Sequence, residues 1–83
     1  MMSASELRRR EVINADTAEK LGFVYDMDID FESGKIDSII VPKRSFPFFF
    51  KKQEYVIPWR NISAIGRDII LVKLDAPENR VFE

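Results

Sequence analysis

Apolar and polar residues alternate along residues 21–32, and this pattern is the strongest structural signal in the chain. Every second position carries a large apolar side chain, and the positions between are mostly small or acidic. The apolar set is Leu21, Phe23, Tyr25, Met27, Ile29 and Phe31. Because successive side chains of an extended strand point to opposite faces, the pattern predicts one strand with a buried face and a solvated face.

A second apolar run follows after a short turn. Gly34 can adopt a positive φ without steric cost, and the β-branched run 36–41 then resumes the strand signal up to Pro42, which we expect to end it. The two runs predict a β-hairpin. Residues 39–41 are apolar on both faces of their strand, so we expect both faces to be covered.

The register of this hairpin stays open. A two-residue turn at positions 33–34 sets Phe31 opposite Ile36 but also sets Asp30 opposite Asp37. A turn with a bulge at Gly34 avoids that repulsion and sets Ile29 opposite Asp37 instead.

Shorter segments complete the expected fold. We predict strands at 11–14, 54–57 and 68–72, and a turn or a single helical turn at 15–20. Ser5 can cap a short helical turn near the start, and the spacing of Trp59, Ile62 and Ile65 predicts a short helical turn near Pro58 to Ile65. The predicted organisation is a lead-in segment at 1–10, one domain at 11–74 and a C-terminal tail at 75–83, in which Val81 and Phe82 have the apolar character to dock.

Composition restricts the chemistry. The 83 residues suit one small domain, and the sequence has neither Cys nor His. Disulfides are therefore excluded, and the usual ligands of zinc and haem, the common general base and the thiol nucleophile are missing. The glycines at 22, 34 and 66 form no phosphate-binding loop. We expect no cofactor, no metal and no enzymatic activity.

Charge gives little support to a nucleic-acid or metal site. The net charge is −1, whereas a dedicated nucleic-acid binder normally has a basic face, so we interpret Arg8, Arg9 and Arg10 as a solvated turn. The acidic stripe Asp26, Asp28, Asp30 and Glu32 could suggest a metal site. Alternate residues of a strand lie roughly 6.5 Å apart, however, which favours a solvated face that discourages edge pairing.

The segment from Phe46 to Lys52 is the most unusual stretch. It contains Phe46, Phe48, Phe49, Phe50, Lys51 and Lys52. Several aromatic rings in a loop must be covered by something, because contiguous exposed apolar area favours association. The loop could fold over its own domain, contact another copy, bind a different protein, or lie on an anionic membrane surface. Trp59 joins this candidate interaction set, although Ile62 and Ile65 on its face favour a core position.

The order of strand signals resembles a known family. Residues 11–14, 21–24, 32–36, 39–42, 55–59 and 68–72 are similar to the PRC-barrel domain, and more narrowly to the sporulation-associated YlmC/YmxH family. The resemblance implies a mainly β fold, a small barrel of about six short antiparallel strands. Such barrels also occur in the photosynthetic reaction-centre H subunit and in a ribosome maturation factor, where they act as interaction modules.

From this resemblance we expect a non-catalytic interaction module that self-associates as a homo-oligomer or binds a protein partner. An RNA-associated or ribosome-associated role and a membrane-surface role through the Phe-rich loop are the alternatives. No apolar run approaches the roughly 20 residues of a membrane span, and the first 20 residues lack the apolar core of a secretory signal. We therefore expect a cytoplasmic protein.

Overall fold

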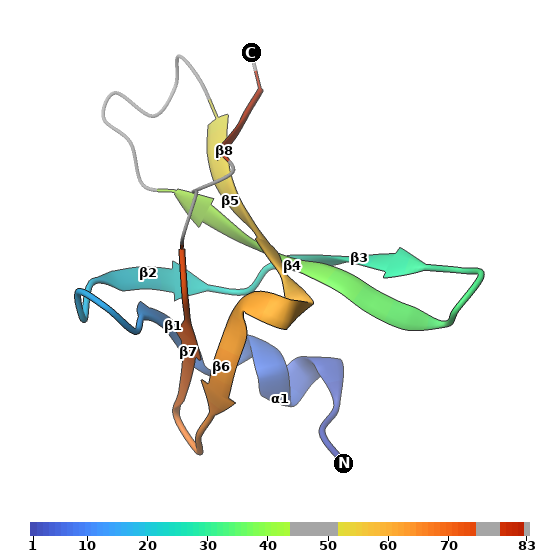
Figure 1. Cartoon of the computed structure of the whole chain (residues 1–83), viewed down its shortest axis with the longest axis horizontal. Helices are drawn as coiled ribbons and strands as arrows, with labels where there is room; N and C mark the ends of the chain where they lie inside the picture. The colour runs from blue at the N-terminus through green and yellow to red at the C-terminus, as the bar shows by residue number, and fades with distance from the viewer. Residues whose placement is uncertain (44–51, 75–78, 83) are drawn as a thin grey trace.

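The structure, a computed structural model, describes residues 1–43, 52–74 and 79–82, and the side chains of Lys52 and of residues 79–82 are not described. It is mainly β, as the sequence predicts (Figure 1). The elements are α1 (Ala4–Arg8), β1 (Glu11–Asn14), β2 (Lys20–Phe23), β3 (Asp26–Asp30), β4 (Lys35–Lys43), β5 (Lys52–Pro58), the 3₁₀ turn η1 (Trp59–Asn61), β6 (Ile62–Ile65), β7 (Ile69–Val72) and β8 (Asn79–Phe82).

The strands form two four-stranded sheets, with the orders β2-β1-β7-β6 and β3-β4-β5-β8. Within the described ranges the ladder hydrogen bonds do not join these sheets into one closed barrel. The expected count of about six strands was too low, and the expectation of antiparallel pairing alone was wrong, since β1 runs parallel to β7. Three strands of the second sheet, β3, β4 and β5, lie between β1 and β7 in the chain, and such a long connection allows parallel pairing.

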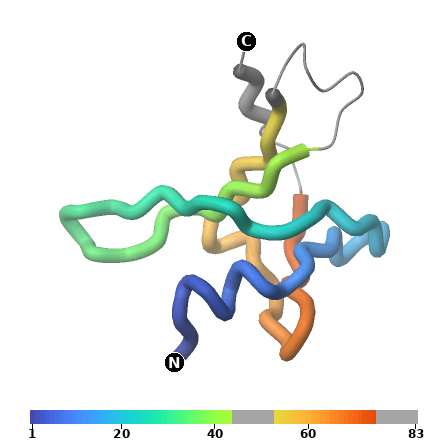
Figure 2. Tube along the Cα trace, turned by 180° about the vertical axis from the view of Figure 1, so that it is seen from behind, coloured from blue at the N-terminus to red at the C-terminus, as the bar shows by residue number. Residues whose placement is uncertain are grey.

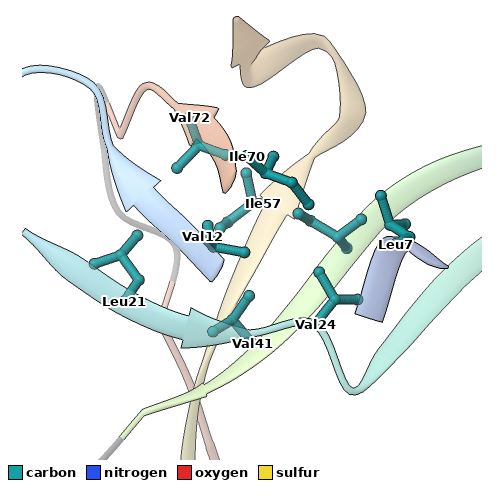
Figure 3. Close-up of a cluster of buried hydrophobic side chains, with 9 residues drawn as sticks. Leu7, Val12, Leu21, Val24, Val41, Ile57, Ile70 and Val72 are labelled. Atoms are coloured by element: carbon teal, nitrogen blue, oxygen red, sulfur yellow. The ribbon is translucent and has the colours of Figure 1, made fainter. Parts of the chain in front are cut away.

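A cluster of buried aliphatic side chains lies between the sheets and α1 (Figure 3). Its members are Leu7, Val12, Leu21, Val24, Ile39, Val41, Ile57, Ile70 and Val72. Along β4, Ile39 and Val41 join this cluster, and Ile40 on the opposite face is only 3% exposed. The prediction that both faces of this strand are covered is therefore confirmed.

The predicted single strand at 21–31 is two strands in different sheets. The chain leaves β2, crosses at Val24, and enters β3 in the other sheet. Gly22 has a φ of +121° and lies where an added Cβ would be 3.4 Å from Val41 Cγ1, so a backbone without a side chain allows β2 to approach β4.

This crossing changes which residues are buried. Val24, which the pattern placed on the polar face, is buried, whereas Phe23, Tyr25, Ile29 and Phe31 are 49%, 51%, 54% and 94% exposed. The predicted buried face was thus wrong for most of its length. The crossing interrupts the alternation, and the β3–β4 hairpin extends away from the rest of the fold (Figure 2).

The register of the hairpin differs from both of the registers that the sequence left open. Residues 31–34 form the turn, Asp30 pairs with Lys35 and Ile29 with Ile36. The next pair joins Asp28 to Ser38, so Asp37 is the extra residue of a bulge. Opposite charges therefore face each other where a two-residue turn would have paired two aspartates. The positive φ expected at Gly34 is confirmed, at +74°.

The end of strand β4 lies further along the chain than the sequence predicts. The expectation that Pro42 ends its strand was wrong, because β4 continues through Pro42 to Lys43. The Ile40 carbonyl points toward β3 and accepts a hydrogen bond from the Tyr25 amide. Pro42 lies two residues further along β4, so its nitrogen points to the same side, but at a position beyond Asp26, where β3 begins. No ladder donor is needed there.

The two predicted helical turns are present, but their bounds or capping residues differ from the predictions. Within the predicted helical turn from Pro58 to Ile65, only Trp59–Asn61 is helical, and the next residues form β6 because Ile62 pairs with Val72 across the sheet. Helix α1 is capped by Ser3, not Ser5, since the Ser3 hydroxyl accepts the Glu6 amide at 3.1 Å. Near the C-terminus, β8 pairs antiparallel with β5.

Candidate interaction surface

An apolar hollow of about 320 Å³ opens at one side of the fold. It is bordered by the start of the chain and α1, by the β3–β4 hairpin, by η1 and by β6. Its lining residues are Met2, Ser3, Ala4, Leu7, Met27, Ile36, Trp59 and Ile65. All of these except Ser3 are apolar, so within the described part of the chain this hollow offers an apolar ligand surface, with almost no polar group to orient a small molecule.

Helix α1 forms one wall of the hollow, and two contacts hold it there. Leu7 is only 4% exposed and belongs to the core cluster. Arg10 donates from Nε to the Gly66 carbonyl at 2.7 Å and from Nη1 to the Glu6 carbonyl at 2.6 Å. The guanidinium thus links the end of α1 to the turn after β6, so two walls of the hollow are fixed relative to each other.

The opposite wall continues outward along the hairpin. Met27 and Ile29 are alternate residues of β3 and share a face, and Ile36 pairs directly with Ile29. Beyond them, Phe31 in the turn is almost fully exposed. Exposed or half-buried apolar residues therefore follow one another along the hairpin from the hollow to the tip.

Charges around this surface are divided by sign. Arg8, Arg9, Arg60 and Arg67 are exposed and lie within two residues of a lining residue in sequence, and the same segments carry the exposed carboxylates of Glu6 and Asp68. The hairpin, residues 26–37, has five carboxylates and one lysine: Asp26, Asp28, Asp30, Glu32, Asp37 and Lys35. The segments that form the walls outside the hairpin thus carry more arginines than carboxylates, whereas the hairpin, which supplies the remaining wall, is mainly acidic.

A second hollow, of about 660 Å³, lies on another side and is mixed in character. It is lined by Glu11, Glu19, Lys20, Leu21, Gly22, Phe23, Lys43 and Tyr55. Lys43 Nζ lies 5.0 Å from the centre of the Tyr55 ring, a cation–π contact. Burial, and to a smaller extent the charge of Glu19, raises the pKa of the Tyr55 hydroxyl above its ordinary 10.0.

One buried polar contact involves Glu54, the residue before Tyr55 in β5. The Tyr25 hydroxyl donates to Glu54 Oε2 at 2.6 Å, and Glu54 is only 5% exposed. A carboxylate at that depth needs such a donor. The contact therefore has a structural role in joining the start of β3 to β5.

Most of the candidate residues from the sequence lie outside the described residues: Phe46, Phe48, Phe49, Phe50 and Lys51. Lys52 is described in its backbone alone, as the first residue of β5. Trp59 is 38% exposed and borders the apolar hollow, so the preference for a core position was wrong. It immediately follows β5, where the chain leaves the sheet, and the core cluster does not include it.

The other charged candidates also have clear positions. Asp26, Asp30 and Glu32 are exposed, as expected of a solvated face, whereas Asp28 is half-buried and accepts a hydrogen bond from the Ser38 hydroxyl at 3.2 Å. Arg8 and Arg9 are exposed, but Arg10 is engaged as described above. Sequence reasoning missed the hollow itself, because its walls come from three separate segments. The useful signal was the run of apolar residues in the predicted hairpin.

No helix in the described ranges is long and apolar enough to cross a membrane. Nor do those ranges contain a group of three or more acidic side chains placed to hold a metal ion.

Comparison with known proteins gives consistent matches. Residues 1–78 match the family described as PRC-barrel domain. The chain is 46% identical over 79 residues to the probable sporulation protein YlmC of Bacillus subtilis, an alignment that covers 93% of this chain and 98% of that protein. It is 39% identical to an uncharacterised protein of Clostridium acetobutylicum, with 88% and 85% covered, and 36% identical to the uncharacterised protein YmxH of Bacillus subtilis, with 93% and 92% covered.

Proposed function

The chain belongs to the PRC-barrel domain family, and on that premise we propose that it is a non-catalytic interaction module that associates with copies of itself. The name of the Bacillus relative, probable sporulation protein YlmC, supports a role of this module in sporulation. We also infer that the two sheets correspond to the halves of the barrel for which the family is named.

The apolar hollow and its extension along the hairpin carry this proposal. Single exposed apolar residues are common on soluble proteins, but a contiguous apolar surface rimmed by charge is typical of a protein-binding site. Trp59 at the rim and Phe31 at the tip are the kind of aromatic residue that supplies most of the binding energy in interfaces. Covering them on association removes apolar area from water.

The non-catalytic part of the proposal has support from composition and from the second hollow. The chain has no His or Cys to act as a base or nucleophile near neutral pH. In the second hollow, Lys43 and Tyr55 contact each other, while Glu54, the residue before Tyr55, accepts a hydrogen bond from Tyr25. These groups stabilise the fold in the described arrangement.

Sedimentation velocity over a wide range of protein concentration tests the proposal. We expect a discrete oligomer whose population rises with concentration, and a weaker one when Trp59→Ala removes the aromatic rim. Phe23→Ala is the matched control, because Phe23 is also a half-exposed aromatic residue but borders the second hollow. A wild-type protein that stays monomeric at the highest concentration would contradict the proposal.

An RNA titration at low salt tests the main alternative. Binding that is lost in an Arg8→Ala/Arg9→Ala variant would favour the nucleic-acid role over self-association. Arg10 is unsuitable for this variant, since its guanidinium holds α1 against the turn after β6.

A further inference from the structure

We propose that each apolar hollow receives the hairpin tip of a second copy, so that two chains form a two-fold symmetric dimer with Phe31 of each chain in the hollow of the other. This inference rests on the proposed self-association and specifies its surface and geometry. It is carried by three features of the described residues: the exposure of the tip, the size and lining of the hollow, and the positions of both on one hairpin.

The tip and the hollow match in size and chemistry. Phe31 is 94% exposed, whereas a phenyl ring normally finds apolar cover. An apolar protein cavity of about 150 Å³ is enough to hold benzene. The hollow, at about 320 Å³, can therefore accept a phenylalanine side chain, and Met2, Leu7 and Trp59 offer it aliphatic and aromatic contacts.

The hairpin geometry favours a two-fold arrangement. The hairpin supplies Met27, near its base, and Ile36, which pairs with Ile29, to the wall of the hollow, and its tip carries Phe31. Four residues of strand span about 13 Å, with Ile29 at the midpoint. When two hairpins cross antiparallel at Ile29, each tip therefore reaches the hollow of the other chain, and both contacts form at once.

The charge distribution favours the same partner. Glu32 follows Phe31 at the tip, and the other hairpin carboxylates lie within a few residues, while the exposed Arg8, Arg60 and Arg67 belong to the segments that form the walls of the hollow outside the hairpin. The Debye length is about 10 Å at 0.1 M salt, so opposite charges brought within that distance on association attract each other. A second copy therefore brings an acidic, aromatic tip to an apolar hollow whose other walls carry more arginines than carboxylates.

Phe31→Asp tests the contact directly. The side chain is almost fully exposed, so the monomer should fold normally, which circular dichroism checks, and dimer affinity should fall at least about tenfold. Phe23→Asp, the control in the second hollow, should leave affinity unchanged. Raising the salt concentration should weaken the wild-type dimer, because it screens the charges around the tip.

A mixing experiment tests the symmetry. Ala4 is exposed and lines the hollow, so Ala4→Trp fills the hollow without changing the core. Neither Phe31→Asp nor Ala4→Trp should dimerise alone. Their mixture should form a heterodimer in native mass spectrometry, because the intact Phe31 of one chain can enter the intact hollow of the other.

The outcomes separate this inference from the proposed function. An oligomer that persists in Phe31→Asp, or that is lost instead in Phe48→Ser/Phe49→Ser, would overturn the hairpin dimer and leave self-association standing. Variants that dimerise only as homodimers, with no heterodimer in the mixture, would also overturn it. A wild-type chain that never associates would remove both.

Discussion

Replacing Ile57 by alanine removes a side chain at the centre of the core. Ile57 lies in β5 opposite Ile39, and both are 0% exposed. Truncation of a buried isoleucine costs about 2 to 5 kcal/mol through lost apolar burial and the cavity left behind. A chain of 83 residues has a total stability of roughly 4 to 12 kcal/mol, so this one change removes a large share of it.

Urea denaturation followed by circular dichroism measures the loss. With a slope of about 1 to 3 kcal/mol/M, the midpoint for Ile57→Ala should fall by roughly 1 M or more. Ile29→Ala is the matched control, since it makes the same chemical change at a side chain that is 54% exposed. Its cost should stay within about 0.5 kcal/mol, the usual range for surface changes, at a concentration where sedimentation shows monomer. Equal losses in the two monomers would refute the assignment of the hairpin to the surface and of β5 to the core.

Three further predictions concern the turn, the α1 contact and alkaline stability. Gly34→Ala should cost about 1 to 2 kcal/mol in urea denaturation from backbone strain alone, because Gly34 has a φ of +74° and an added Cβ meets nothing within 4 Å. Arg10→Ala should cost about 1 kcal/mol and speed hydrogen exchange in α1, since it removes the bonds to Glu6 and Gly66, and unchanged exchange would contradict that role. The raised pKa of Tyr55 means that the native state favours its protonated form, so this contribution is fully present below pH 10.0 and is lost as the pH rises through the folded pKa. Tyr55→Phe should therefore flatten the alkaline decline of the urea midpoint, and identical pH profiles would count against the burial of this hydroxyl.

Elements with a local signal could be predicted from the sequence. The β-branched run of β4, the short strand β1 and the glycine of the hairpin turn depend on backbone preferences of a few residues, and all three were found. Helix α1 was expected as a single turn, and its cap was misplaced by two residues. Serines at positions 3 and 5 are both good caps, so local preference alone could not separate them.

Features that depend on distant contacts could not be predicted. The alternation at 21–31 correctly indicates extended chain, but whether Val24 or Phe31 is buried depends on where the chain changes sheet. The parallel pairing of β1 with β7 joins residues more than 50 positions apart. The hollow likewise has walls near Leu7, Ile36 and Ile65, and no local pattern links these segments.

The hairpin combines features that favour contact through its face over contact through its edge. Strand β3 is at the edge of its sheet and carries Asp26, Asp28 and Asp30 between its apolar residues. Carboxylates along an exposed edge oppose the addition of a further strand, which is how native sheets limit uncontrolled pairing. The apolar face formed by Met27, Ile29 and Ile36 has no such obstacle. Because edge pairing can continue indefinitely whereas mutual insertion of two tips closes after two chains, this arrangement favours a discrete dimer over a growing fibre.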